Sequence, residues 1–273
     1  MSISYLIENF FTHKDFLPPA SELWGTMFTP LHFIFAAFWL AIVIFFGIYV
    51  GKRSERTIKR VFLVLWIFLV TLEISKMIWE SCAGDGIKFE WGGVIPLYPC
   101  SIFMYAMPLV LWGKGLVRRA GCGYVCTLGF LGGAINFIYP ATVLTNYSAL
   151  SFAGFQIFIY HGALIFCMMV MLISGYHSYK GVTRWYEMFV TMIPFLAVSV
   201  VANIVNFSPI NSDYMFFKLD SFFFAPIGAA LPKPVCVIIV YLLYTVIHIA
   251  PYLPSYVSNK LKARREAALG EID

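Results

Sequence analysis

Long apolar segments separated by short polar loops dominate the chain. A membrane-spanning helix needs about 20 mostly apolar residues, because the hydrocarbon core is about 30 Å thick and each residue rises about 1.5 Å. Seven segments fit this pattern, although the third and fourth are short. They run from Phe28 to Val50, Val61 to Trp79, Leu97 to Trp112, Gly121 to Ile138, Ala153 to Gly175, Trp185 to Phe207 and Pro232 to Leu253. The pattern predicts an all-α polytopic membrane protein, a single domain of seven transmembrane helices over residues 1–273.

Composition agrees with a lipid environment. The chain of 273 residues is 60% hydrophobic, 18% aromatic and only 12% charged, whereas soluble domains carry about a quarter charged residues. So little polar surface excludes an ordinary water-soluble globule. The net charge of +5 comes mostly from basic residues in short loops. Membrane topology explains those residues, so we expect no nucleic-acid partner.

The distribution of Lys and Arg predicts the orientation. Fourteen of the 19 lie in the C-terminal tail and in the loops after the first, third and fifth predicted spans, which share one side of the membrane. The positive-inside rule assigns that side to the cytoplasm. We therefore expect residues 1–27 to form an extracytoplasmic N-terminal segment without a cleavable signal peptide, residues 208–231 an extracytoplasmic loop, and residues 254–273 a basic cytoplasmic tail.

The six cysteines lie mostly in or beside apolar segments, which is not the pattern of a disulfide framework. Cys122 and Cys126 are four residues apart, but no nearby Cys or His pair completes a zinc site. We expect both to be small packing residues. No metal and no cofactor are predicted.

Ionisable side chains inside the membrane are candidates for function, because each costs about 2.5 to 3.5 kcal/mol to insert. The second predicted span carries Glu73, Lys76 and Glu80 on one helical face, where Lys76 can pair with either carboxylate. One interpretation is a structural ion pair that faces the bundle interior. The other is that one of the carboxylates orients a catalytic or ligand-binding group.

Further polar residues fall at the same level as this face, in the outer half of the predicted bundle. They are His32, Cys100, Ser101, Asn136, Gln156, His161, Asn203 and Asn206. Cys100 follows Pro99 at the start of the third span, where a helix N-terminus favours the thiolate and a nearby imidazole would favour it further. His161 lies about 12 Å deep in its span and Cys100 about 5 Å, an offset larger than a hydrogen bond. A buried cysteine in inert packing and a structural histidine are the simpler interpretation.

The segment from Ser208 to Leu231 is too apolar for a solvated linker. It is either a lid over an outward-facing cavity or an interfacial hairpin that anchors the fold. These two interpretations are equally open.

Four short motifs resemble a known family. The segment Ile95–Ser101 resembles the Pro-Leu-His-x-Cys sequence at the start of the third span of the YwaF-like integral membrane proteins. Gly132–Asn136, Phe158–Gly162 and Asn211–Phe216 match further motifs of that family in order and spacing. The resemblance covers nearly the whole chain. It implies a mostly bacterial family, similar to a vertebrate branch associated with acyl transfer onto ether phospholipids.

The resemblance also implies roles for particular residues. Cys100 matches the proposed catalytic thiol of the vertebrate branch, and His161 matches the histidine of its fifth span. This chain departs from the bacterial members at Tyr98, where they have His, and at Asp213, where they have Asn. The missing histidine puts the chemistry in question if that residue is the essential base.

Three functions are open at this stage. The first is a membrane enzyme that transfers or hydrolyses a lipid acyl chain through a thioester on Cys100, with His161 as general base and Asn136 or Asn203 steadying the oxyanion. Its partners would be membrane lipids, because cytosolic acyl-CoA cannot reach a site in the extracytoplasmic half of a bacterial cytoplasmic membrane. The second is binding or transport of a small solute by the polar cluster. The third is a non-catalytic membrane subunit whose protein partners the sequence does not identify.

Overall fold

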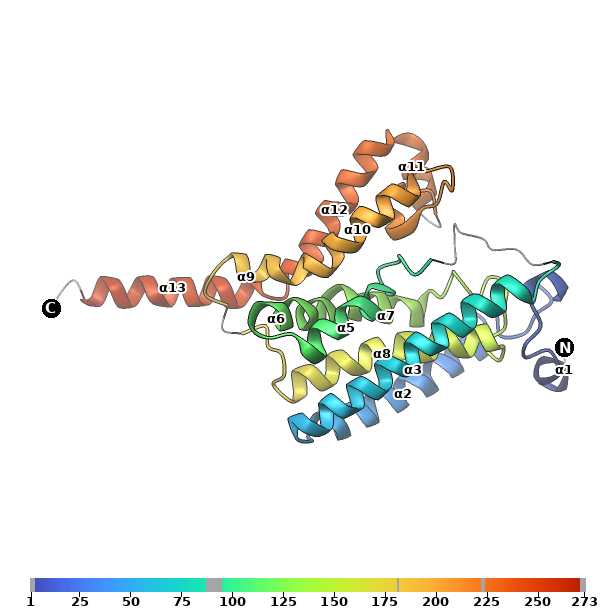
Figure 1. The fold of residues 1–273 in the computed structure, drawn as a ribbon, viewed down its shortest axis with the longest axis horizontal. Helices are drawn as coiled ribbons and strands as arrows, with labels where there is room; N and C mark the ends of the chain where they lie inside the picture. The colour runs from blue at the N-terminus through green and yellow to red at the C-terminus, as the bar shows by residue number, and fades with distance from the viewer. Residues whose placement is uncertain (1–2, 87–94, 181, 222–223, 271–273) are drawn as a thin grey trace.

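The computed structural model describes residues 3–86, 95–180, 182–221 and 224–270, and every regular element in these ranges is helical (Figure 1). This confirms the predicted all-α class. One group of helices packs around α8 (Phe152–Ile173) and contains α2 (Pro30–Gly51), α3 (Glu55–Cys82), α5 (Ile102–Trp112), α6 (Gly115–Tyr124) and α7 (Phe130–Ile138). A second group contains α9 (Tyr186–Phe189), the 3-10 turn η3 (Val190–Met192), α10 (Ile193–Asn206), α11 (Ala225–Ala230) and α12 (Lys233–Ile249). Short elements at the rim are α1 (Ile3–Glu8), η1 (Lys14–Phe16) and η4 (Tyr214–Phe216).

Five helical segments of the described chain are long and apolar enough to cross a membrane. They are Pro30–Gly51, Glu55–Cys82, Gly115–Ile138, Phe152–Ile173 and Tyr186–Asn206. A sixth is reached if α12 and α13 (Leu253–Gly270), which meet at a bend of 59°, form one broken span. The chain is therefore an integral membrane protein of several passes. The predicted count of seven requires α5 as well, which is a shorter apolar helix of 11 residues.

The predicted third span is short because its first turns are not helical. Tyr98 and Pro99 belong to a turn that ends at Ser101, and α5 begins only at Ile102. Pro99 has no backbone N–H to donate and disfavours helical geometry at the residue before it. The turn therefore precedes the helix and carries Cys100 beside it.

The fourth predicted span is one continuous rod with a wide turn in its middle. Between α6 and α7 the chain forms a π-helical segment, η2 (Val125–Gly129). Such wide turns often occur at functional sites. Here the segment follows Tyr124, whose hydroxyl donates a hydrogen bond of 2.5 Å to the carbonyl of Pro99. The rod is thereby tied to the turn that carries Cys100.

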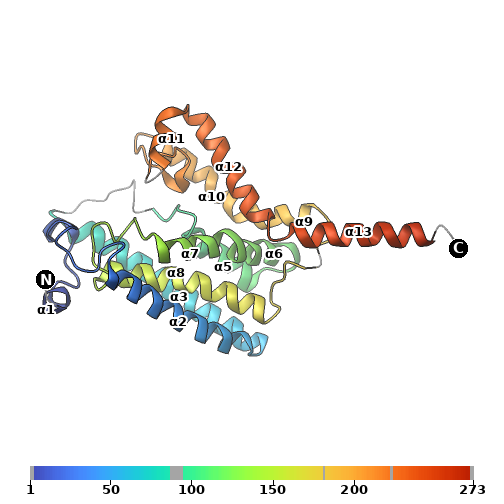
Figure 2. The same ribbon diagram turned by 180° about the vertical axis from the view of Figure 1, so that it is seen from behind.

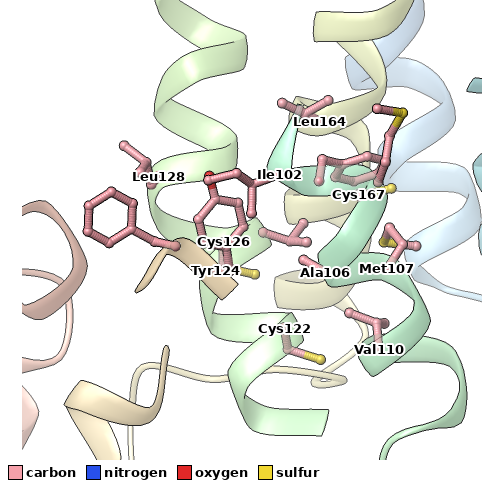
Figure 3. Packing of buried hydrophobic residues seen from close by; sticks show 14 of the residues in the cluster. Ile102, Ala106, Met107, Val110, Cys122, Tyr124, Cys126, Leu128, Leu164 and Cys167 are labelled. Atoms are coloured by element: carbon pink, nitrogen blue, oxygen red, sulfur yellow. The ribbon is translucent and has the colours of Figure 1, made fainter. Parts of the chain in front are cut away.

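The core between α5, α8 and the rod formed by α6 and η2 contains the two cysteines that were predicted to pack, together with Cys167. Cys122, Cys126 and Cys167 are buried among Met107 and Leu164, and their side chains lie within the cluster in Figure 3. Burial in this cluster agrees with a packing role for the two cysteines of the fourth span.

Charged and hydrogen-bonded side chains close the end of the bundle near α6. Arg119 binds Glu187 of α9 at 2.6 Å, and Arg118 lies 3.7 Å from the ring centre of Tyr176. In the loop after α8, His177 hydrogen-bonds the hydroxyl of Tyr252 at 2.8 Å. Burial, with a smaller contribution from Arg119, lowers the pKa of His177 to about 4. From this end α13 projects away from the other helices (Figures 1 and 2). The predicted C-terminal tail is therefore not a disordered segment but a helix over most of its length.

The opposite end is covered by the N-terminal segment. The Trp79 indole N–H donates to the carbonyl of Phe11 at 3.0 Å, and the Lys14 ammonium lies 3.1 Å from Glu80. The second group of helices leans away from α7 at this end, with α10, α11 and α12 diverging from it in both views (Figures 1 and 2). The walls of the cavity described next come from both groups.

Candidate functional site

A cavity of about 640 Å³ lies between the two groups of helices. This volume falls within the range of about 300 to 1,000 Å³ that is typical of small-molecule sites. Its wall is formed by α3, the turn before α5, α7, α8, α12, the loop between α7 and α8, and part of the Ser208–Leu231 segment. Phe216, Leu219 and Phe224 are that segment's contribution, so it covers one side of the cavity.

Most of the residues singled out from the sequence line this cavity. They are Glu73, Lys76, Glu80, Tyr98, Cys100, Ser101, Asn136, Gln156 and His161. Asn203 and Asn206 are not among the described residues of the wall. The Asn203 amide donates to the hydroxyl of Tyr241, and Asn206 exchanges hydrogen bonds of 2.8 and 2.7 Å with the backbone of Tyr214. These two asparagines hold α10 to α12 and to η4.

Cys100 is held by its backbone. Its carbonyl accepts a hydrogen bond of 3.5 Å from the hydroxyl of Tyr160 in α8, and the preceding carbonyl accepts the bond from Tyr124. Two tyrosines on different helices therefore fix the turn. The residue is partly exposed within the chain and lines the cavity, in contrast to the buried Cys122 and Cys126.

His161 presents a free nitrogen at the cavity. Its Nδ1 lies 2.8 Å from the carbonyl of Ile157 one turn earlier. A carbonyl can only accept, so Nδ1 carries the proton and the neutral ring has a lone pair on Nε2. Within the described part of the chain Nε2 has no hydrogen-bond partner, although the residue is only 7% exposed. Buried polar atoms are normally bonded, so this nitrogen is available to a group that enters the cavity.

His248 provides a useful comparison. Its Nδ1 also donates to the carbonyl one turn earlier, that of Tyr244, and its Nε2 is likewise unpartnered among the described residues. Its ring lies between those of Tyr124 and Phe195, at centroid distances of 5.6 and 5.9 Å. The same local bonding thus occurs at two histidines, but only His161 lines the cavity.

Two adjacent glycines of α7 bring the thiol segment and α8 together. A Cβ atom on Gly132 would lie 3.7 Å from the Cβ of Cys100, and one on Gly133 would lie 2.8 Å from the carbonyl oxygen of His161. One helix therefore packs against both candidate residues. Within the described chain no hydrogen bond joins the thiol to the imidazole, which agrees with the offset in depth expected from the sequence.

The two carboxylates on the charged face of α3 have different partners. Glu73 is buried and accepts a hydrogen bond of 2.6 Å from the amide of Gln156, while Lys76 lies 3.8 Å from its other oxygen. Glu80 instead binds Lys14 and accepts from the hydroxyl of Tyr147 at 3.3 Å. The loose contact of Lys76 leaves its ammonium available at the cavity wall.

The wall has a polar side and an apolar side. The charged and amide groups come from α3, α8 and the segments near them, whereas α12 contributes Val240, Leu243 and Ile247. Leu243 of α12 and Ile135 of α7 both line the cavity and are 46% and 47% exposed. Both views show α12 leaning away from α7 on this side, and these two wall residues are apolar (Figures 1 and 2).

Several residues of the site were not found from the sequence. Tyr124 and Tyr160 are aromatic residues within apolar helices, and nothing in their spacing marks them as anchors of the Cys100 turn. Lys14 and Tyr147 reach Glu80 from distant segments. The two glycines of the Gly132–Asn136 motif were the one sequence signal that α7 packs closely against the Cys100 turn and α8. The described residues contain no group of three or more His, Cys, Asp or Glu side chains that could hold a metal ion.

The apolar helices and the cavity between them define a multi-pass α-helical membrane protein. The comparison with known families assigns it further. The TMEM164 family matches residues 27–252, which is most of the chain, and the protein therefore belongs to the TMEM164 family. Neither a curated protein nor a solved structure shows significant similarity to the chain.

Proposed function

We propose that the protein transfers or hydrolyses lipid acyl chains at the cavity, with Cys100 as nucleophile and His161 as general base. The observation that carries the proposal is the unpartnered Nε2 of buried His161 on a cavity wall that also contains the Cys100 thiol. The motif resemblance to proteins associated with phospholipid acyl transfer supports the same assignment.

The division of the wall favours a lipid substrate. Contact with the apolar side chains of Leu243 and Ile247 keeps an acyl chain out of water and so lowers its free energy. Lys76 and Gln156, on the polar side of the wall, can bind a polar headgroup. A lipid substrate enters from the bilayer between α7 and α12, which lean apart beside the cavity (Figures 1 and 2). A small polar solute would instead require a path through water, and the exposed wall residues Ile135 and Leu243 are apolar.

The chemistry follows from the two side chains. Nε2 of His161 accepts the thiol proton, and the Cys100 sulfur attacks the carbonyl carbon of a lipid ester. The ester C–O bond breaks, a thioester forms on sulfur, and the leaving alkoxide takes the proton from His161. A lysolipid hydroxyl or water then attacks the thioester carbonyl and gives its proton to His161. The C–S bond breaks, and the Cys100 sulfur takes that proton back from His161 as the free thiol. The two side chains approach each other when substrate binds, as catalytic hydrogen bonds often do.

Asn136 is the better placed of the two proposed oxyanion donors. It lines the cavity on α7, four residues after Gly132, and one of its amide hydrogens is bonded to the Gly132 carbonyl at 2.9 Å. The other amide hydrogen serves the oxyanion. Asn203 lies apart from the wall and bonds to Tyr241 instead.

The orientation belongs to the same proposal. The concentration of Lys and Arg in the α2–α3 turn, the start of α6 and α13 supports a cytoplasmic location for that end of the bundle. The N-terminus and the cavity then lie toward the extracytoplasmic face. The resemblance to mostly bacterial proteins supports a bacterial cytoplasmic membrane, and membrane phospholipid as the acyl donor.

Activity of matched variants in proteoliposomes tests the proposal. The purified protein is reconstituted with a labelled diacyl phospholipid and a lysolipid acceptor, and labelled products are separated. Cys100→Ala and His161→Asn are expected to abolish turnover, whereas Cys126→Ala and His248→Asn, which alter residues of the same types away from the cavity, retain it. Equal turnover in Cys100→Ala and Cys126→Ala would reject Cys100 as the nucleophile, whereas no turnover in wild type would reject the enzyme and leave solute binding or a subunit role.

A further inference from the structure

A second, apolar groove lies on the other side of α8. It has a volume of about 550 Å³, with α2 and α3 as its walls and Gly162 and Ala163 of α8 on its floor. Val64 of α3 is 67% exposed at its edge. Among the described residues that line the groove, Arg60 is the one charged side chain.

The groove has the length of one bilayer leaflet. Along α2 it extends from Val50 to Trp39 and along α3 from Arg60 to Phe68. At about 1.5 Å per residue these stretches are about 16 and 12 Å long, and half of a hydrocarbon core of about 30 Å is about 15 Å. Val50 and Arg60 are the lining residues of α2 and α3 nearest the α2–α3 turn, so we place the charged end at the membrane surface and the apolar end, at Trp39 and Phe68, near the middle.

The charged end is unneutralised. Glu55 is the acidic residue of this turn, and it is already bound by Lys59 and Arg118 at 3.4 and 3.3 Å. No ion pair involves Arg60 or Arg56 within the described chain, and both are exposed. A guanidinium at the interface binds phosphate oxygens with two parallel hydrogen bonds, and basic sites between helices on the cytoplasmic side bind anionic lipid headgroups.

We propose that this groove is a binding site for one anionic phospholipid, whose acyl chain lies between α2 and α3 and whose phosphate binds Arg60. The site is separate from the cavity, because α8 presents Gly162 to the groove and His161 to the cavity. The lipid fills the space between two helices that otherwise contact α8 more than each other. Its binding therefore stabilises the packing of α2 and α3 on α8.

The proposal is tested with two matched pairs of variants in lipid nanodiscs. Arg60→Gln is compared with Arg56→Gln, which removes an exposed arginine of the same helix outside the groove. Val64→Trp, which fills the groove, is compared with Ile67→Trp, a similarly exposed position of α3 outside it. Lipid that remains bound after transfer to detergent is counted by native mass spectrometry, with phosphatidylglycerol or phosphatidylcholine supplied.

Wild type is expected to retain one phosphatidylglycerol in preference to phosphatidylcholine. Arg60→Gln binds it about fivefold more weakly, the change expected from losing one interfacial basic residue, and Val64→Trp loses it. Arg56→Gln and Ile67→Trp retain it. An equal loss in the two arginine variants, unchanged affinity in Arg60→Gln, or undiminished retention in Val64→Trp would each overturn the site.

Discussion

The contact between Gly133 of α7 and α8 sets the spacing of the candidate site, and replacing this glycine by alanine tests it. The new Cβ would lie 2.8 Å from the carbonyl oxygen of His161 and 3.1 Å from the Cβ of Leu164. Backbone cannot rotate away as a side-chain end can, so the two helices must separate. Overpacking of this kind lowers the free energy of unfolding by about 1 to 3 kcal/mol, while alanine in place of glycine within a helix raises it by about 1 kcal/mol.

Gly132→Ala is the matched control on the same helix. Its Cβ would lie 3.7 Å from Cys100, an ordinary contact, so it gains the helix preference without the clash. Both variants gain the same helix propensity from alanine, so this contribution cancels in the comparison. The free energy of unfolding of Gly133→Ala should therefore be about 1 to 3 kcal/mol lower than that of Gly132→Ala. Unfolding in mixed micelles, followed by Trp fluorescence, measures the difference. Equal stability of the two variants would refute the close approach of α7 and α8.

Three further predictions concern groups around the site and at the ends of the bundle. Gln156→Leu removes the donor to buried Glu73 and should lower the free energy of unfolding by about 1.5 to 3 kcal/mol, with partial recovery when Glu73→Gln is added; no loss would contradict the buried hydrogen bond. His177 has its pKa lowered to about 4 from 6.5 by burial, so the unfolded chain binds the proton first and stability should fall by up to about 3 kcal/mol as the pH drops from 7 toward 4. His177→Gln should reduce this slope in unfolding measured against pH, and an unchanged slope would assign it to other groups. Asp213→Ala removes a carboxylate that accepts from the backbone N–H groups of Lys218 and Asp220, so exchange of these two amides should accelerate about tenfold or more; unchanged exchange would show that the carboxylate does not hold the loop.

The sequence predicts helices best where a long apolar run coincides with end signals. The predicted spans from Phe28 and from Ala153 lie within two residues of α2 and α8 at each end, because Pro30 opens one helix and Ser151 caps the other by accepting from the N–H of Gly154. The third predicted span begins too early, since hydropathy cannot distinguish an apolar turn at Pro99 from an apolar helix. The last predicted span runs past the end of α12, which meets α13 at a bend of 59°, and the break between these helices contains Pro251, which interrupts the helix.

The site was predictable in its residue types more than in its contacts. Spacing alone placed Glu73 and Lys76 on one face, and the structure pairs them at 3.8 Å. It could not show that Glu80 binds a lysine 66 positions earlier in the chain. Asn203 donates to the hydroxyl of Tyr241 in α12, since the rotation of α10 is decided by its packing against its neighbours, among them α5 and α6. Such rotations depend on tertiary contacts that periodicity does not contain.

The central claim is that the Cys100 sulfur carries the acyl group, and its most direct test is the mass of that residue. The purified protein is incubated with diacyl phospholipid without an acceptor, stopped with acid and digested, and the peptide that contains Cys100 is measured. The account predicts an added acyl mass on Cys100 that hydroxylamine removes, reduced in His161→Asn and absent in Cys100→Ser. An unmodified Cys100 in a preparation that still turns over phospholipid would contradict it.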